Sequence, residues 1–215
     1  MTNTSAPRKA SPRRSPGETR DALMEAAFGL VRRQGLAATT VDDICAAAGV
    51  SKGAFFHHFK SKDELAAAAA YHWSAVTEPV FEGAAYHAPE DPLDRVLGYI
   101  DLRGAMMDGE IAEFTCFAGT MVQEAWATSP AVRAAAWDSM SRHADALVAD
   151  IEAAKASRGV ELDARSLALH MVAVVQGAFI LAKASGNPAI GTQSTLHLRR
   201  YVELLFAGPA ERNNA

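Results

Sequence analysis

The chain has 215 residues, and its 49% hydrophobic and 21% charged residues are ordinary for a soluble globular protein that buries one or two cores. Its net charge of −4 is divided unevenly, since residues 1–62 carry 10 Lys and Arg against 5 Asp and Glu, whereas residues 63–215 carry 11 against 20. This division favours a basic part that meets phosphates and an acidic part that does not, with chance as the alternative explanation. Two cysteines, Cys45 and Cys116, exclude a disulfide framework and fit a reducing cytoplasm.

Residues 1–15 are rich in Ser, Pro and Arg and are predicted to form a disordered basic tail. Such a tail follows a DNA backbone or enters a minor groove, or else is merely solvated; its basic residues are Arg8, Lys9, Arg13 and Arg14. The tail lacks the apolar core of a signal peptide, and the longest apolar stretch, Met171 to Ala182, is too short to span a bilayer. We therefore expect a soluble, cytoplasmic protein with no membrane partner.

A first helix is predicted to begin with Ser15 as its cap, Pro16 at its first position and Glu18 as the capping glutamate. Gly35 is expected to end it. Between these ends an apolar stripe lies on one face, formed by Leu23, Ala26, Ala27, Leu30 and Val31. This helix is predicted to be the scaffold on which the next two helices pack.

The stretch TVDDICAAAGVSKGAFFHHFKSK, residues 40–62, is typical of two short helices joined by a tight turn. Thr40 and Asp43 match a capping box, and Gly49 supplies the left-handed residue at which helices commonly end. Ser51 then caps a second helix, in which Phe55 and Phe59 lie four residues apart and point into a core.

The outer face of this second helix carries a small residue, hydrogen-bond donors and a flat ring. Lys52, Ala54, His57 and His58 are expected to face outward or sideways, with Phe56 on the flank. Side chains of these sizes and chemistries fit a major groove, where a helix presents them to base edges.

After Lys62 we find no alternating strand pattern, so the predicted fold class is all-α. The helix that follows Lys62 is expected to break between Val76 and Phe81, because Pro79 cannot continue its hydrogen bonding. Later helices are predicted over residues 92–107, 111–128, 130–157, 164–184 and 192–206.

The run TVDDICAAAGVSKGAFFHHFKSKDEL closely resembles the DNA-binding domain of TetR/AcrR-type transcriptional regulators. The shared features, spread over Glu18 to Leu65, are the glycine before the turn, VSKG, an aromatic–x–His–Phe segment and K-x-K-x-x-L. Phe56 departs from the tyrosine of many relatives and lacks a hydroxyl for a phosphate. The resemblance implies a three-helix helix-turn-helix domain over 16–62, a larger helical ligand-binding and dimerisation domain over 63–208, and a tail over 209–215.

On this reading the partner is a double-stranded DNA operator. Two residues at helix starts are expected at DNA phosphates, namely Thr40 and Ser51. Three further residues are expected to face the DNA backbone, namely Lys52, Gly53 and Lys62. The residues expected at bases or sugars are Ala54, Phe56, His57 and His58.

The predicted helix over 164–184 is apolar nearly all round and must be covered on both sides. Its own body covers one side, and a partner subunit would cover the other. The resemblance implies that the last two helices pair with their twins in a four-helix homodimer interface. The residues expected there are Val175, Phe179, Leu196 and Tyr201.

The resemblance also implies a cavity for a small-molecule effector in the body. The large, soft or polar residues expected to line it are Met106, Phe114, Phe117, Met121, Trp126, Trp137, Met140, His143 and Gln176. The alternative for each of them is a place in an ordinary core. An acidic, aromatic-rich body favours apolar or cationic effectors.

No catalytic set, glycine-rich phosphate loop or spaced histidine pair is found, so we predict no catalytic residue, cofactor or metal. Cys116 is a candidate sensor, with an inert buried thiol as the alternative.

The predicted function is that of a ligand-responsive repressor, which binds a near-palindromic operator as a dimer and is released by a small molecule. The alternatives are a constitutive or architectural DNA-binding protein whose body only dimerises, and an all-α enzyme with an accidental helix-turn-helix. A closed cavity in the body would distinguish the first from the second.

Overall fold

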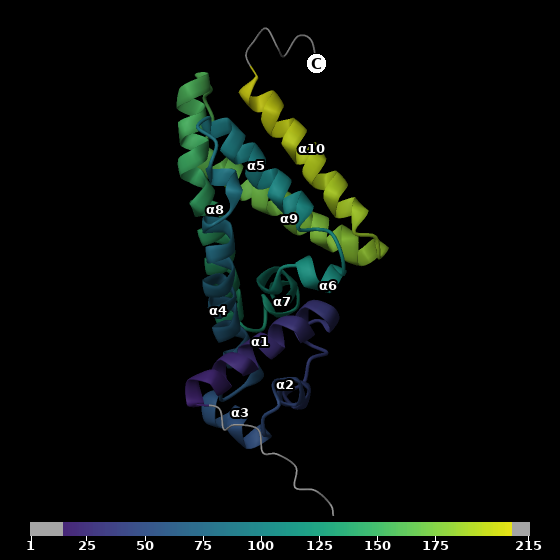
Figure 1. Cartoon of the computed structure of the whole chain (residues 1–215). Coiled ribbons are helices and arrows are strands. Elements are labelled where there is room, and N and C mark those ends of the chain that lie inside the picture. The colour runs from purple at the N-terminus through teal and green to yellow at the C-terminus, as the bar shows by residue number, and fades with distance from the viewer. Residues whose placement is uncertain (1–14, 208–215) are drawn as a thin grey trace, which may run out of the picture.

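The structure is a computed structural model that describes residues 15–207. The basic residues of the predicted N-terminal tail and the predicted tail over 209–215 therefore lie outside the described residues. Within residues 15–207 every regular element is a helix, which confirms the all-α prediction. Figure 1 shows a small helical head at one end of the molecule and a larger helical body at the other.

The head consists of α1 (Pro16–Gln34), α2 (Val41–Ala48) and α3 (Lys52–His58). Both predicted capping boxes are present, because Ser15 accepts the Glu18 N–H and Thr40 accepts the Asp43 N–H through their hydroxyl oxygens. Gly49 has a φ of 65°, which confirms the left-handed end predicted for α2. Local sequence signals therefore place all three helices.

The helix after the head, α4 (Lys62–Glu82), does not break at Pro79 as predicted. Pro79 lies in the last turn of α4. Its missing N–H removes one backbone hydrogen bond, but the carbonyl groups at a helix end lack intrahelical partners in any case. The Thr77 hydroxyl donates to the Trp73 carbonyl at 2.8 Å and supports the preceding turn. One uninterrupted helix therefore runs from the head along the body (Figure 1).

The body contains a short 3-10 helix, η1 (Ala85–His87), and six α-helices. These are α5 (Pro92–Ala105), α6 (Ile111–Phe114), α7 (Phe117–Ala125), α8 (Pro130–Arg158), α9 (Ala164–Ser185) and α10 (Ala189–Phe206). α4 packs along α8, α8 also packs on α9, and α10 packs on α5 and α9.

The single helix predicted over 111–128 is wrong, because the chain forms two helices there. Thr115 is extended, with a ψ of 150°, and ends α6. Cys116 then caps α7, since its Sγ accepts the Gly119 N–H at 3.4 Å. The thiol of Cys116 is thus used structurally at a corner that periodicity alone does not reveal.

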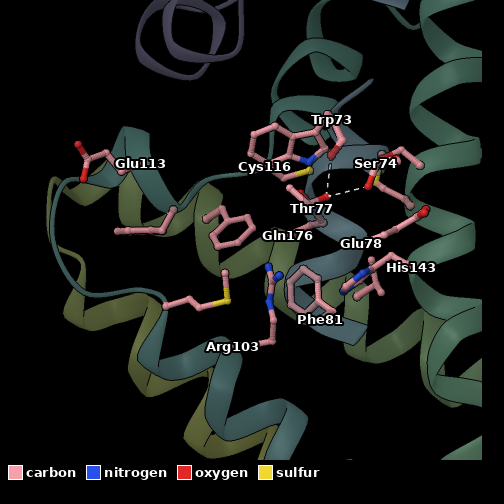
Figure 2. A pocket seen from close by; sticks show the side chains of 16 residues that line it. Trp73, Ser74, Thr77, Glu78, Phe81, Arg103, Glu113, Cys116, His143 and Gln176 are labelled. Carbon is pink, nitrogen blue, oxygen red and sulfur yellow. Dashed lines mark hydrogen bonds between the residues drawn. The ribbon is translucent and has the colours of Figure 1, made fainter. Parts of the chain in front are cut away.

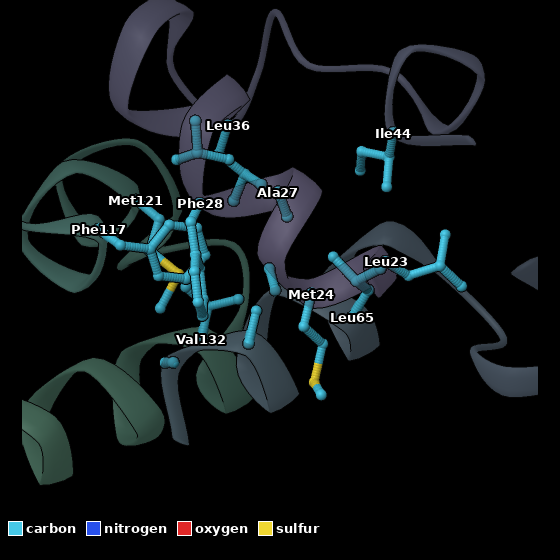
Figure 3. Close-up of a cluster of buried hydrophobic side chains, with 14 of the residues drawn as sticks. Leu23, Met24, Ala27, Phe28, Leu36, Ile44, Leu65, Phe117, Met121 and Val132 are labelled. Carbon is cyan, nitrogen blue, oxygen red and sulfur yellow. The ribbon is translucent and has the colours of Figure 1, made fainter. Parts of the chain in front are cut away.

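A continuous apolar core joins the head to the body. Figure 3 shows α1 side chains packed against those of α7 and α8. Phe28 on α1 is central, with its ring 5.2 Å from that of Phe117 and 5.1 Å from that of Trp73. The predicted boundary between residues 62 and 63 falls at the start of α4, whose Leu65 and Ala69 are buried in this same core. A second core lies among α5, α8, α9 and α10.

A polar contact holds the same joint from the other side. The Glu124 carboxylate on α7 accepts the Ala37 N–H at 2.6 Å. Gly35, at the end of α1, has a φ of 85°, and a Cβ there would lie 2.2 Å from the Glu124 carboxylate. Gly35 therefore serves both the chain reversal and the close approach of α7.

The loop between α1 and α2 is closed by the ammonium of Lys62. It donates to the carbonyl oxygens of Leu36, Thr39 and Ala37 at 2.7, 2.9 and 3.4 Å. An ammonium has three donors, so these carbonyls use its full capacity. Lys62 therefore ties the start of α4 to the head.

Lys62→Met is expected to lower the free energy of unfolding by about 2–3 kcal/mol, because charge-assisted bonds are lost and part-buried carbonyls lose their partners. Lys60→Met, at the exposed neighbouring lysine, is the matched control and should stay close to wild type. Thermal or urea unfolding checks both. Equal stability of the two variants would refute the structural role of Lys62.

Candidate DNA interface and ligand pocket

The outer face of α3 is open to solvent. Phe55 and Phe59 are buried beneath it, as predicted from their spacing. Of the residues expected at DNA, Lys52, Gly53, Phe56 and His57 are exposed, and Ala54 and His58 are partly exposed. The helix thus presents one lysine, two imidazoles and a ring that is 52% exposed at Phe56. This set can donate hydrogen bonds and make flat apolar contacts in a groove.

The two predicted helix starts differ in charge. At α2 the Thr40 hydroxyl and backbone N–H hydrogen-bond to Asp43 and lower the pKa of its carboxyl below the ordinary value. A carboxylate therefore already stands at that helix start. At α3 the Ser51 hydroxyl accepts the Ala54 N–H at 3.2 Å, and the first turn holds no acidic residue.

Two lysines expected at phosphates lie in different surroundings. Lys52 is paired with Asp42 at 3.0 Å, but both side chains are more than half exposed, so the pair is weak and can open. Lys62 does not belong with the exposed residues of α3, because its ammonium already donates hydrogen bonds to carbonyl oxygens of the α1–α2 loop. Its expected phosphate contact is therefore replaced by a structural one.

The body contains a cavity of about 130 Å³, partly open to solvent, between α4, α5, α6, α8 and α9. Figure 2 shows the side chains that converge on it. Five of the nine residues predicted to line the pocket do so, namely Met106, Phe114, Met140, His143 and Gln176.

The other four predicted lining residues lie elsewhere. Phe117 and Met121 on α7 are fully buried, but in the core that faces α1. Trp126 and Trp137 are 59% and 56% exposed. The size and flexibility of a side chain do not indicate which way it points. The break at Cys116 turns α7 away from the cavity.

Sequence reasoning missed the face of α4 and one arginine. The α4 residues that line the cavity are Trp73, Ser74, Thr77, Glu78 and Phe81. Their spacing of three and four residues is that of one helical face, so polar positions along an otherwise apolar face were an available signal. Arg103 on α5, which also lines the cavity, had no such signal.

The polar groups of the pocket form defined pairs. The Ser74 and Ser139 hydroxyls lie 2.7 Å apart. His143 Nε2 lies 2.8 Å from the Tyr99 hydroxyl, and burial, with a smaller effect of Arg103, lowers the pKa of His143 to about 3. The imidazole is therefore neutral at physiological pH. The Glu78 carboxylate is held by Arg142 at 2.8 and 3.0 Å.

The predicted interface residues separate into two groups. Val175 and Phe179 on α9 face inward, and Phe179 lines the cavity. Leu196 and Tyr201 on α10 are exposed. Further large apolar side chains exposed on α9 and α10 are Ile180, Leu181 and Leu204. α9 is apolar nearly all round because one face packs on the cavity and core while the other is left uncovered.

Within residues 15–207 no group of three or more His, Cys, Asp or Glu residues could hold a metal ion. By length and composition α9 is also the one helix in this range that could cross a membrane. Because α9 packs against α8 and α10, its composition is that of a core helix.

Comparisons with known proteins agree with this arrangement of head and body. Residues 23–69 match the model of bacterial regulatory proteins of the tetR family, and residues 92–198 match that of the tetracyclin repressor-like C-terminal domain. The chain belongs to the TetR family. The members of this family are described as bacterial regulatory proteins.

Curated TetR-family relatives match shorter segments. The chain is 44% identical over 50 residues to the transcriptional repressor KstR2 of Mycolicibacterium smegmatis, which is 23% of this chain and 24% of KstR2. It is 41% identical over 76 residues to the regulator CymR of Pseudomonas putida, covering 34% and 37% of the two chains. The chain thus matches much less than two thirds of these relatives' lengths.

Solved structures extend the likeness to the whole fold. A TetR-family regulator from Agrobacterium tumefaciens has a TM-score of 0.74 at 23% identity, covering 90% of this chain and 100% of that one. A TetR regulator from Chloroflexus aurantiacus has a TM-score of 0.73 at 26% identity, covering 87% and 95%. The reduced form of E. coli NemR has a TM-score of 0.72 at 20% identity, covering 90% and 99%. The neighbours below 25% identity show a shared fold.

Gly53→Ala tests how closely DNA approaches α3. A Cβ at Gly53 would meet only the Ser51 hydroxyl, at 3.8 Å, so the fold accommodates it and helix propensity improves. We expect unchanged or higher thermal stability, but roughly tenfold weaker DNA binding if a phosphate lies against this backbone. Gly17→Ala, where an added Cβ also meets open space, is the control. Wild-type affinity in Gly53→Ala would place the DNA backbone farther from α3.

Proposed function

We propose that this TetR-family protein is a repressor that binds a near-palindromic operator as a homodimer and is released when a small molecule enters the body cavity. The observation that carries this proposal is the path of α4. It starts directly after α3, and five of its side chains line the cavity. A molecule in the cavity therefore touches the helix that holds the head.

On the DNA side, the exposed residues of α3 divide by chemistry. Ser51, Lys52 and Gly53 are placed to meet the phosphate backbone, which supplies affinity and salt dependence. Ala54, Phe56, His57 and His58 would face bases or sugars and supply sequence preference. Phe56 would contact a sugar or thymine methyl. Lys62 belongs to neither group.

Dimerisation is supported by the uncovered face of α9 and α10. Large apolar side chains, including Leu181, Leu196 and Tyr201, are exposed there within a single chain. A two-fold axis through this face would pair the two helices with their twins, and such a self-complementary patch is the usual form of a homodimer interface. The dimer would then place two α3 helices in successive major grooves about 34 Å apart.

A second link between cavity and head runs through Arg32 on α1. Its Nη1 donates to the Glu113 carbonyl at 2.7 Å, and its guanidinium lies 4.9 Å from the ring of Trp73. Glu113 and Trp73 both line the cavity. A ligand that displaces α6 or the Trp73 ring therefore acts on α1 as well as on α4. Such a ligand weakens DNA binding only by the difference between its binding free energies for the displaced and the undisplaced arrangement.

The alternative of a constitutive or architectural DNA-binding protein needs no cavity in the body. A cavity with paired polar groups on several helices favours a ligand-binding role over a body that only dimerises. The neighbours in both comparisons are named as transcriptional regulators, which gives the enzyme alternative no support.

Leu196→Asp is expected to yield a folded monomer that no longer binds operator, because a charge would be buried in the proposed interface at a cost of several kcal/mol. The side chain is 59% exposed in the single chain, so the subunit's own core is spared. Val80→Asp, on the exposed side of α4, is the matched control and should remain dimeric. Sedimentation velocity decides between them. A stable Leu196→Asp dimer would move the interface elsewhere.

The ligand switch is tested by reciprocity. A compound selected by binding to the protein should bind more weakly, by about 5- to 150-fold, when operator DNA is present, and DNA should lose the same factor when the compound is present. Equal affinities with and without operator would leave a DNA-binding regulator without this switch.

Arg32→Met tests the proposed route of that coupling. It should retain ligand and DNA binding separately but reduce the coupling factor, because the link between α6 and α1 is lost. Arg33→Met, which removes the neighbouring exposed guanidinium, is the control and should keep the wild-type factor. An unchanged factor in Arg32→Met would assign the coupling to α4 alone.

A further inference from the structure

Arg103 is a half-buried arginine whose Nε is fully buried. It stands in the last turn of α5, and Figure 2 shows its side chain directed into the cavity beside Phe81. Its guanidinium lies 5.3 Å from the ring of Phe81 and 5.5 Å from the ring of Phe179. Its Nε is buried with no hydrogen-bond partner. Among residues 15–207, no carboxylate lies within ion-pair distance of it.

The contacts that Arg103 makes leave its buried Nε–H without an acceptor. Two aromatic faces attract the positive charge, and so does the negative end of the α5 dipole. Neither accepts a hydrogen bond in the guanidinium plane, where the buried Nε–H needs a partner. A buried donor without a partner costs about 1–3 kcal/mol, and more when it is charged. This arrangement is therefore incomplete without an acceptor in the cavity.

The acidic residues that line the cavity do not supply this acceptor. Glu78 is bound by Arg142 through both carboxylate oxygens. In Figure 2 the Glu113 carboxylate is turned away from Arg103. His143, which is neutral, is paired with Tyr99. Arg103 is thus a positive charge of the pocket lining that no ion pair compensates, which is opposite to the apolar or cationic preference predicted from the acidic composition of the body.

The remaining walls indicate the size and shape of the missing partner. The rings of Phe81, Phe114 and Phe179, with Met140 and Val172, give a mainly apolar lining. The cavity of about 130 Å³ is close to the roughly 150 Å³ of an engineered cavity that holds benzene. One ring with a short substituent fits such a space. A guanidinium edge binds a carboxylate through two parallel hydrogen bonds.

We propose that the effector is a small aromatic carboxylic acid, whose carboxylate is bound by Arg103 and whose ring lies among Phe81, Phe114 and Phe179. This inference rests on the proposed effector role of the cavity. The amide of Gln176, which makes no hydrogen bond to another described residue, is a second polar group available to the acid. The acid would complete the hydrogen bonding of Arg103 and neutralise its charge in a single step.

The test is calorimetric titration of the full-length protein with three acids, benzoate, phenylacetate and 3-phenylpropanoate. Each is paired with its neutral amide, and benzylamine is the cationic probe. At least one acid should bind at least about tenfold more tightly than its amide, with no binding of benzylamine. An amide or benzylamine that binds as well as every acid would overturn the proposal. Failure of all three acids to bind at millimolar concentration would overturn it too.

Arg103→Met keeps the length of the side chain and removes its charge. It should lose the preference for acid over amide while the unliganded protein keeps its thermal stability, because a buried donor without a partner is removed. Arg165→Met, which removes an exposed guanidinium paired with Asp145, makes the same charge change outside the cavity and should bind like wild type. Arg103→Lys keeps the charge and should retain part of the acid preference. An acid preference unchanged in Arg103→Met would overturn the assignment.

Operator release separates this inference from the proposed function. If an acid binds through Arg103 but does not release DNA, the anion site stands and the ligand switch fails. If a neutral compound binds in the cavity and releases DNA while the acids do not bind, the switch stands and the acid specificity fails.

Discussion

The packing of Phe28 against Phe117 and Trp73 is the contact on which the rest of this structure depends. These three rings come from α1, α7 and α4, and their centroids lie 5.1 to 6.3 Å from one another. Aromatic pairs at such distances bury large areas and hold defined mutual angles. The head therefore does not hang from a linker but shares a core with the body (Figure 3). A close-packed core transmits displacement, because its side chains have little space into which to relax.

Polar contacts at the same joint add direction to this packing. Glu124 holds the backbone at Ala37, and Arg32 holds the carbonyl of Glu113. Burial, the largest effect on it, lowers the pKa of Arg32, as expected for a guanidinium enclosed between two parts of a molecule. The head is thus fixed to α6 and α7 as well as to α4. Of these helices α4 and α6 contribute side chains to the cavity wall, and both contact the head.

The state of the buried polar groups varies along the molecule. Thr195 donates to the Thr192 carbonyl, whereas Thr115 Oγ1 and His72 Nε2 are buried without a hydrogen-bond partner among residues 15–207. In the cavity the serine pair, the His143–Tyr99 pair and the Glu78–Arg142 pair are satisfied, while Arg103 is not. Proteins keep unsatisfied buried polar groups rarely, because each costs stability. The unpaired Nε–H of Arg103 beside an apolar cavity is the observation on which the proposed acid site rests.

Local signals in the sequence determined the class and the head of this protein. Capping residues such as Ser15 and Thr40, the left-handed Gly49 and the i, i+4 pair of Phe55 and Phe59 act within a few residues, so they can be read without the fold. The same signals indicate which residues of α3 remain exposed. Helix existence in the body followed from periodicity in the same way, apart from the break at Thr115 and Cys116.

Only the tertiary structure decided which side chains meet in the cavity and which cover the joint. Phe117, Trp126 and Met140 are all large and soft, yet one lies in the core, one faces solvent and one lines the cavity. Lys62 follows the pattern of a phosphate-binding residue, but the loop between α1 and α2 folds back and takes all its donors. The lack of an ion-pair partner for Arg103 is set by the tertiary structure, which pairs Glu78 with Arg142 and turns Glu113 away. Periodicity specifies a face of a helix, whereas the element opposite that face is set by packing between segments far apart in the chain.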